Sequence, residues 1–438
     1  RRAAAMPPSE PLHTPSRVED TSALQKLQRL PLFREAAPAF MRVHTNEFIA
    51  SFERLQNPTA CANSTIMVQR LEIHGGIGNT MNVLAQQVAL GWKRLKANVV
   101  LEAQVDLTGW KWLNDNPWCA LRRPGGGTEL LGFECLWMPL SPCVGYVRAN
   151  RRAKNIIWST HYRKMPNIRG AGARALSYLM RPNDRLAGWL ADKYLEFWRA
   201  KRGLAVTSRS QLISVHIRWS DKLADGDLHP VSKYLEYVLS IADRWQIEQP
   251  VVFLSSEDGS AISLFEQAVA SHPKASHVRV VKYDYHRISQ NCGGLDIGKL
   301  LGVQGSGMKK AEAPSLLMGN TSKLTFKKRS ELLLTQGTCA TPSDLKDHAR
   351  KYSEDLTLIS LLNLYLALEC RHIICLTASN WCWMLRYLAD QDTTTITGEY
   401  ALVGNGTHET KFIMRGPQGP GTELRPKIVL PRHILANN

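Results

Sequence analysis

Two apolar stretches in the second half of the chain are each followed by polar side chains that could bind an anion. The first leads into Val-His-Ile-Arg-Trp-Ser-Asp-Lys at Val215–Lys222, and the second, His372–Leu376, leads into Thr-Ala-Ser-Asn at Thr377–Asn380. An arginine can donate two parallel hydrogen bonds to a phosphate, and the free N–H groups of a helix N-terminus attract the same anion. Arg218 and a helix that begins near Ser379 could therefore hold a diphosphate.

Each of these features also has a purely structural interpretation. Arg218 could form a surface or interdomain salt bridge, and Ser379 could simply cap the helix that follows it. The Gly76-Ile77-Gly78-Asn79 segment could let the backbone approach phosphates, since glycine has no Cβ, or could be a tight turn without a ligand. Residue types alone leave both interpretations open.

The elements that carry these side chains alternate between strand and helix. Short apolar strands are expected to form a mostly parallel sheet when helices separate them, and ligands bind beyond the carboxyl ends of such strands. Both polar segments lie at such ends. The expected elements are strands 212–217, 251–255, 278–282 and 372–376, and helices 231–245, 260–271, 355–369 and 380–389.

The first half of the chain predicts one more strand–helix–strand unit. A strand at Thr65–Ile73 leads through the glycine segment to a helix at Met81–Leu95 and a strand at Asn98–Glu102. Ala171–Lys201 has the pattern of a long amphipathic helix that is broken at Arg181-Pro182, because proline cannot continue the hydrogen-bond ladder.

The length of 438 residues exceeds one typical domain and favours two. We expect an α/β protein with the following organisation. Residues 1–40, rich in Pro, Ser and Arg, predict a stem or linker; residues 41–204 form an N-terminal α/β lobe; residues 205–400 form a C-terminal Rossmann-like domain with a loop insertion at 285–350; and residues 401–438 form an extension.

The charge of the chain, +17 with a pI near 9.5, indicates an anionic partner such as a nucleotide sugar, a nucleic acid or a membrane surface. Basic groups such as Arg151-Arg152 and Lys327-Lys328-Arg329 lie far apart, without a nucleic-acid motif around them. We therefore expect a solvated basic surface and no nucleic-acid partner. No run of about 18 apolar residues is present, so membrane attachment is expected only through a type II anchor that would precede the first residue.

Nine cysteines are compatible with reduced thiols in the cytosol or with disulfides in the secretory pathway. Sequons at Asn63, Asn320 and Asn405 favour the secretory pathway. Pairings such as Cys61 with Cys119, or Cys135 with Cys143, are conceivable, but the spacing does not select them.

The segment around Arg218 resembles a known family. Together with His229-Pro230 and Tyr234, it is similar to the Val-His-Val-Arg-Arg-Thr-Asp-Lys … His-Pro-x-x-x-Tyr pattern of the α1,6-fucosyltransferases that act on N-glycan cores or bacterial nodulation factors. Three more segments resemble the family, and the resemblance covers about Thr65–Ala389 without the insertion. These segments are Tyr178–Pro182, Ser255–Asp258 and Leu362–Trp383, the last with Cys375 and Cys382 at the family's spacing.

This resemblance implies two Rossmann-like lobes in a GT-B-like arrangement, with the nucleotide sugar bound by the C-terminal lobe. It implies an inverting, metal-independent transfer of fucose from GDP-fucose in the Golgi lumen, in α1,6 linkage to GlcNAc of an N-glycan core. The implied partners are GDP-fucose and a glycan or glycoprotein acceptor. The resemblance also implies a role for each matching residue. His216 and Asn363 would contact guanine, and Arg218, Ser379 and Asn380 would contact the β-phosphate. Asp221 and Lys222 would shape the adjoining loop, and Gly76, Gly78 and Asn79 would lie near the nucleotide. The resemblance further implies a Cys375–Cys382 disulfide that would brace the Ser379 loop.

Three departures from the family pattern bear on the donor. Trp219 replaces a second arginine, Asn363 replaces a guanine-binding aspartate, and Asn380 replaces a glutamine. Asparagine cannot make the charge-assisted bond that a carboxylate makes with guanine. Another nucleotide sugar, or a non-catalytic glycan-binding role, is therefore an alternative to GDP-fucose transfer.

An inverting transfer needs a base that takes the proton of the acceptor hydroxyl, and a carboxylate beside the sugar is the usual solution. Asp225 is the position that best matches the family's glutamate, and Asp227 is the alternative. Asp225-Gly226-Asp227 could instead hold a divalent cation or be a solvated acidic loop. We expect no metal or other cofactor, because Arg218 already supplies positive charge.

Overall fold

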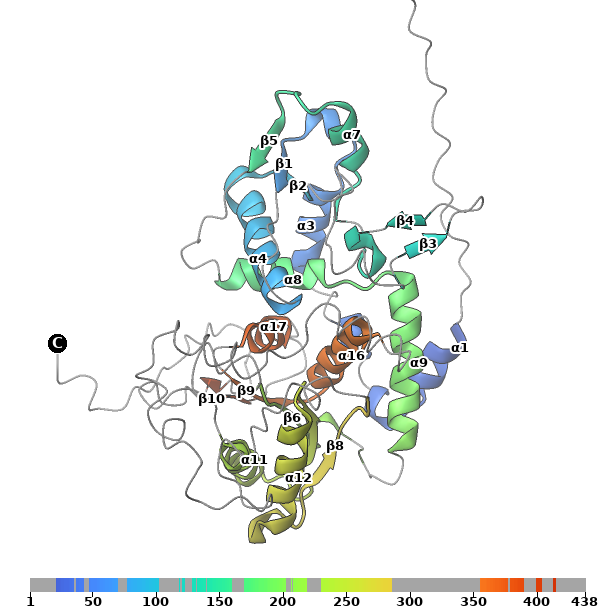
Figure 1. The fold of residues 1–438 in the computed structure, drawn as a ribbon. Coiled ribbons are helices and arrows are strands. Elements are labelled where there is room, and N and C mark those ends of the chain that lie inside the picture. Colours follow the sequence, from blue (N-terminus) through green and yellow to red (C-terminus); the bar gives the residue numbers. More distant parts are fainter. Residues whose placement is uncertain are drawn as a thin grey trace, which may run out of the picture.

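The protein is a mixed α/β structure with two parallel sheets in this computed structural model (Figure 1). The strand order is β2-β1-β5 in the first sheet and β11-β10-β9-β6-β7-β8 in the second. The second sheet is parallel except for β11 at its edge. The structure describes residues 21–34, 37–42, 47–69, 77–101, 118, 120–122, 128–130, 132–138, 140–159, 169–201, 206, 208–218, 230–285, 355–376, 379–389, 399–403 and 413–414.

The first sheet contains the predicted strand–helix–strand unit. Strand β1 is buried along its whole length and pairs in parallel with β2 on one side and β5 on the other. Helix α4 begins at Ile77, so Ile77–Asn79 form its first turn instead of a separate turn before a helix at Met81. The bounds are β1 Ile66–Gln69, α4 Ile77–Leu90, a π-helical turn Gly91–Leu95, β2 Asn98–Leu101, α7 Val144–Ala149 and β5 Ile156–Ser159.

The second sheet confirms the predicted alternation in the C-terminal half. Strand β6 lies between β7 and β9, and all three are buried, as continuous apolar strands of a parallel sheet should be. Strands β10 and β11 continue this sheet past residue 400, where the sequence had placed a boundary. The strands are β6 Leu212–His216, β7 Val251–Ser255, β8 Arg279–Val281, β9 His372–Leu376, β10 Glu399–Val403 and β11 Ile413–Met414; the helices are α11 Val231–Trp245, α12 Gly259–Ser271, α16 Leu356–Leu368 and α17 Asn380–Ala389.

Helices from the two halves of the chain pack against each other between the sheets (Figure 1). Helix α17 contacts both α4 and α8, and side chains from both halves belong to one buried cluster. The predicted break at Pro182 is confirmed, with Asn183 accepting a hydrogen bond from the Leu186 amide at the start of α9. The remaining bounds are α3 Glu47–Gln56, α8 Arg169–Leu179, α9 Asp184–Ala200, β3 Ala120–Arg122 and β4 Thr128–Leu130.

The expected stem is wrong for residues 21–34 and 37–40, which are folded. Helix α1 (Thr21–Gln28) packs on α9, and α2 (Ala39–Arg42) packs on α9 and α16. Leu27, Phe33 and Phe40 are almost fully buried there. This segment has few apolar residues, and the helices that cover them are more than a hundred residues away in the sequence. A local hydrophobic periodicity therefore does not predict that the segment folds.

Two disulfides join pairs of cysteines within the described residues. Cys375–Cys382 confirms the pairing that the family resemblance implied, and Cys61–Cys143 shows that the pairings Cys61–Cys119 and Cys135–Cys143 were wrong. Cys135 is also disulfide-bonded, and Cys370 is free and buried. Within the described ranges, no helix combines the length and apolar character needed to cross a bilayer.

Candidate functional site

The N-terminal turns of α4 and α17 meet where the carboxyl end of β9 leads into α17. The Asn380 side chain donates to Asn79 Oδ1 at 3.4 Å, and the Asn82 side chain donates to the Asn380 carbonyl oxygen at 3.1 Å. A Cβ at Gly78 would lie 3.2 Å from the backbone nitrogen of Trp381. Two positive ends of helix dipoles therefore converge on one region, which favours a negatively charged ligand.

His216 closes one side of this region at the end of β6. Its Nδ1 lies 3.0 Å from the Ser255 hydroxyl oxygen, and its ring centroid lies 6.0 Å from that of Trp381. Its Nε2 is buried and has no hydrogen-bond partner among the described residues. A buried polar atom without a partner is costly unless a ligand satisfies it. His216 Nε2 is thus positioned to bond a ligand atom.

Burial, together with the nearby Arg218 guanidinium, lowers the pKa of His216 to about 3. The imidazole is therefore neutral at physiological pH. A neutral ring offers one donor and one acceptor nitrogen, which suits a heterocyclic base better than an isolated phosphate.

Arg218 follows β6 and forms an ion pair with Glu257, which follows β7. Both side chains are only partly buried, with 26% and 33% of their surface exposed. Asp258 is buried beside them and accepts from the Ala261 amide at 3.3 Å in the first turn of α12. Glu257 holds the guanidinium at the carboxyl edge of the sheet. A phosphate that binds there could replace Glu257 as the acceptor of the hydrogen bonds that Arg218 donates.

The sequence-predicted site residues divide into three groups. His216, Arg218, Gly78, Asn79, Ser379 and Asn380 lie along the carboxyl edge of β6 and β9 and the helix turns that face it. Asn363 lies on α16, which packs on β6 and α17; it is buried, and its Nδ2 donates to the Ile359 carbonyl at 2.9 Å. The third group lies outside the described residues and consists of Gly76, Asp221, Lys222, Asp225 and Asp227; Trp219 lies outside them as well.

Three residues of the site were not singled out from the sequence. Trp381 shares the first turn of α17 with Asn380, Asn82 bridges α4 to α17, and Glu257 binds Arg218. Glu257 had a usable signal, because it lies two residues after the end of β7 and within the Ser255–Asp258 segment that resembles the family. Trp381 and Asn82 had none, because their partners come from distant parts of the chain. The described residues contain no cluster of three or more His, Cys, Asp or Glu side chains that could hold a metal ion.

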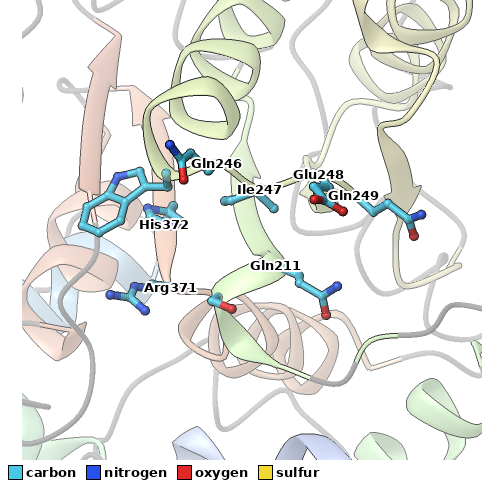
Figure 2. A pocket seen from close by; sticks show the side chains of 9 residues that line it. Gln211, Gln246, Ile247, Glu248, Gln249, Arg371 and His372 are labelled. Atoms are coloured by element: carbon cyan, nitrogen blue, oxygen red, sulfur yellow. The ribbon is translucent and has the colours of Figure 1, made fainter.

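A separate pocket of about 510 Å³ lies at the opposite, amino edge of the second sheet (Figure 2). Its walls come from the start of β6, the loop after α11 and the start of β9. The Arg371 guanidinium lies 5.1 Å from the centre of the Trp245 ring at its rim. Ligands of open α/β sheets bind at the carboxyl edge, so this pocket is distinct from the candidate site.

Gly78→Ala is expected to lower the free energy of unfolding by about 1 kcal/mol, because the new methyl group must push against the backbone of α17. Gly188→Ala in α9 is the matched control. No atom lies within 4 Å of a Cβ at that position, so alanine should raise stability by about 0.5–1 kcal/mol through its helix propensity. Urea unfolding of both variants measures the difference. Stabilisation by both substitutions would show that α4 and α17 are not in close contact.

Acidification is expected to destabilise the fold through His216. The unfolded chain binds a proton on this histidine below about pH 6.5, whereas the folded chain keeps the ring neutral down to about pH 3. The free energy of unfolding should therefore fall by up to about 1.4 kcal/mol per pH unit across that window. Urea unfolding at pH 7.5 and 5.5 should show a smaller fall for His216→Gln than for the wild type, and an unchanged fall for His277→Gln, which alters an exposed histidine. Equal falls in all three proteins would contradict the assignment.

Comparisons with known proteins find similarity among solved structures but not among family models or curated proteins. No protein-family model matches the sequence, and no curated protein matches it. A mutant of Arabidopsis thaliana FUT1 in complex with GDP is similar with a TM-score of 0.36 and 9% identity, over 87% of this chain and 78% of that chain. Because a TM-score this low does not establish a shared fold, we infer nothing about this chain from that structure.

Proposed function

We propose that this chain is an inverting glycosyltransferase that moves fucose from GDP-fucose to a glycan acceptor. The observation that carries the proposal is the convergence of the α4 and α17 N-termini beside His216 and Arg218. Support also comes from the sequence, because these positions coincide with the segments that resemble α1,6-fucosyltransferases. The donor, the α1,6 linkage to an N-glycan core and the Golgi lumen are parts of this proposal.

The GDP leaving group explains the chemistry gathered at this edge of the sheet. When the bond between fucose C1 and the β-phosphate oxygen breaks, negative charge grows on that oxygen. Arg218, the Ser379 hydroxyl and the N–H groups of the first turn of α17 from Asn380 onward would stabilise this charge, and such stabilisation is usually the largest single term in catalysis. His216 Nε2 would hydrogen-bond the guanine base.

The acceptor side of the reaction needs a general base. We propose that Asp225, or Asp227 in its place, takes the proton of the acceptor hydroxyl while the oxygen attacks fucose C1 from the face opposite to GDP. Lys222 and Asp221 would order the loop between Arg218 and this base. We further propose that no metal ion takes part, because Arg218 and two helix N-termini supply positive charge to the diphosphate.

Asn363 favours a second candidate, a transferase of the same kind that uses another nucleotide sugar. Its Nδ2 already donates to the Ile359 carbonyl, which leaves its Oδ1 to accept a hydrogen bond from a base. One neutral acceptor would bind the two guanine N–H groups more weakly than a carboxylate does. The proposal therefore needs a test of whether the protein prefers GDP-fucose to other nucleotide sugars.

A donor and acceptor panel tests the function. The purified protein is incubated with GDP-fucose, GDP-mannose, UDP-GlcNAc or CMP-sialic acid, and with N-glycans, chitin oligomers or glycopeptides, and nucleotide release and products are measured. The proposal expects release of GDP from GDP-fucose and formation of an α1,6-fucosylated N-glycan, and EDTA should leave both unchanged.

Release of nucleotide from another donor would support the second candidate. Activity that EDTA abolishes and Mn²⁺ restores would contradict the metal-free reaction, and binding of no nucleotide diphosphate would favour a non-catalytic glycan-binding protein.

A further inference from the structure

Positive charge is concentrated in one part of the sequence. No aspartate or glutamate occurs between Cys135 and Asn183, whereas nine lysines and arginines do, which is more than half of the net charge of +17. A stretch of this length without an acidic residue is unusual in a globular protein, where both signs are normally interspersed. The nine are Arg148, Arg151, Arg152, Lys154, Arg163, Lys164, Arg169, Arg174 and Arg181.

Four of these cations gather at the end of the molecule that points away from the second sheet, between α7 and β5 (Figure 1). Arg148 lies in the last turn of α7, and Arg151, Arg152 and Lys154 follow in the connection to β5; all four are exposed. Trp158 and Ile157 on β5 are also exposed, at 36% and 41%. We call these six residues the basic tip.

The basic tip is built on a rigid base. The Cys61–Cys143 disulfide joins the start of α7 to the segment before β1. The Asn155 side chain donates to the carbonyl oxygens of Cys61, Ala62 and Ser64 and accepts from the Tyr146 hydroxyl at 3.2 Å. The Trp158 indole N–H donates to the Arg151 carbonyl at 3.1 Å. The backbone that carries the cations is thereby fixed before any ligand arrives, which lowers the entropy cost of binding.

We propose that the basic tip binds a sulfated polysaccharide. Arginine forks match the oxygens of a sulfate group as they match those of a phosphate, and three of the four cations are arginines. The order Asn-Arg-Arg-Ala-Lys-Asn at Asn150–Asn155 places three cations within four residues, dense enough for adjacent sulfates on one chain. The exposed Trp158 ring offers an apolar surface to the face of a sugar ring.

Other polyanions fit the basic tip less well. Proteins that bind single-stranded nucleic acid stack successive bases on several aromatic rings along a groove, whereas the tip has one tryptophan, whose N–H is bound to Arg151. A membrane-binding helix needs an apolar face that enters the bilayer, and only Ile157 and Trp158 are apolar here. The disulfides and the exposed Asn63 sequon favour a secretory location, where sulfated polysaccharides occur.

The test compares two triple variants that lose the same charge. Arg151→Gln/Arg152→Gln/Lys154→Gln removes three of the four cations of the tip, and Arg244→Gln/Lys274→Gln/Arg279→Gln removes three exposed cations around the second sheet. Binding of a heparin oligosaccharide of defined length is measured by calorimetry at several salt concentrations, and melting temperatures confirm that both variants fold. We expect the tip variant to bind at least about tenfold more weakly, with the slope of log Kd against log salt reduced by about two to three. The control variant should stay within about twofold of the wild type.

Each other outcome overturns the proposal. Equal losses in the two variants would show that heparin senses only the overall charge. Single-stranded DNA of equal charge that competes as well as heparin would indicate a general polyanion surface. Binding to phosphatidylserine vesicles that depends on the tip, without heparin binding, would indicate a membrane contact. Desulfated heparin that binds as tightly as heparin would exclude sulfate as the recognised group.

Discussion

Arg218→Ala is expected to reduce GDP release from GDP-fucose by at least about 100-fold, the size of effect seen when a donor is removed from an oxyanion site. In the free protein the Arg218 guanidinium is held by Glu257 at the carboxyl edge of the sheet. The proposed reaction uses that guanidinium to stabilise the charge on the departing β-phosphate. Steady-state assays of GDP release measure the loss, which should appear mainly in kcat.

Two further substitutions make this result specific. Arg218→Lys keeps the charge but loses the fork, so it should recover only a small part of the activity. Arg279→Ala removes an exposed arginine from β8 and should leave turnover within about twofold of the wild type. Near-normal turnover of Arg218→Ala would remove this residue from the site and, with it, the proposed leaving-group chemistry.

Glu369→Ala is expected to lower the free energy of unfolding by about 3–5 kcal/mol, the usual cost of leaving buried charge without its counter-ion. Glu369 is fully buried at the end of α16, and its Oε2 lies 3.2 Å from Arg42 Nη2 and 2.9 Å from Arg209 Nη2. Its other oxygen accepts from the Ala39 amide. Removing this carboxylate leaves two largely buried guanidinium groups facing each other and detaches α2. Urea or guanidinium unfolding followed by circular dichroism measures the change.

The control for this prediction is an exposed ion pair. Lys193 and Glu196 lie one turn apart on α9, with 32% and 62% of their side chains exposed. Solvent screens such a pair, so Glu196→Ala should cost less than about 1 kcal/mol. Unfolding energies of the two variants within about 1 kcal/mol of each other would mean that the Glu369 cluster does not hold the N-terminal segment.

The strands of the second sheet could be predicted because each is a short, continuous apolar run bounded by polar residues, as buried parallel strands are. The predicted strands Leu212–Ile217 and His372–Leu376 agree with β6 and β9 to within one residue. The same reasoning found the helix break, because Pro182 acts locally. Helix α1 and helix α2 could not be found in this way, since their burial depends on α9 and α16.

The candidate site shows the same division. Residue types and spacing indicated Arg218, Ser379 and the glycine segment as candidates, because strand ends and helix starts are local features with local signals; the family resemblance added a role for His216. The approach of Gly78 to Trp381, the buried Nε2 of His216 and the Arg218–Glu257 pair are contacts between segments far apart in the chain. Rules based on neighbouring residues cannot predict such contacts.

The sequence by itself determined the main strands and helices of the second sheet, since these follow from short-range pattern, and side-chain chemistry predicted which residues on them could bind a diphosphate. Only the tertiary structure decided that the α4 and α17 N-termini meet, that Cys61 pairs with Cys143, and that Glu369 pairs with both Arg42 and Arg209. The physical reason is that packing brings together segments that are distant in sequence, and a pairing across such distances leaves no periodic trace in either segment.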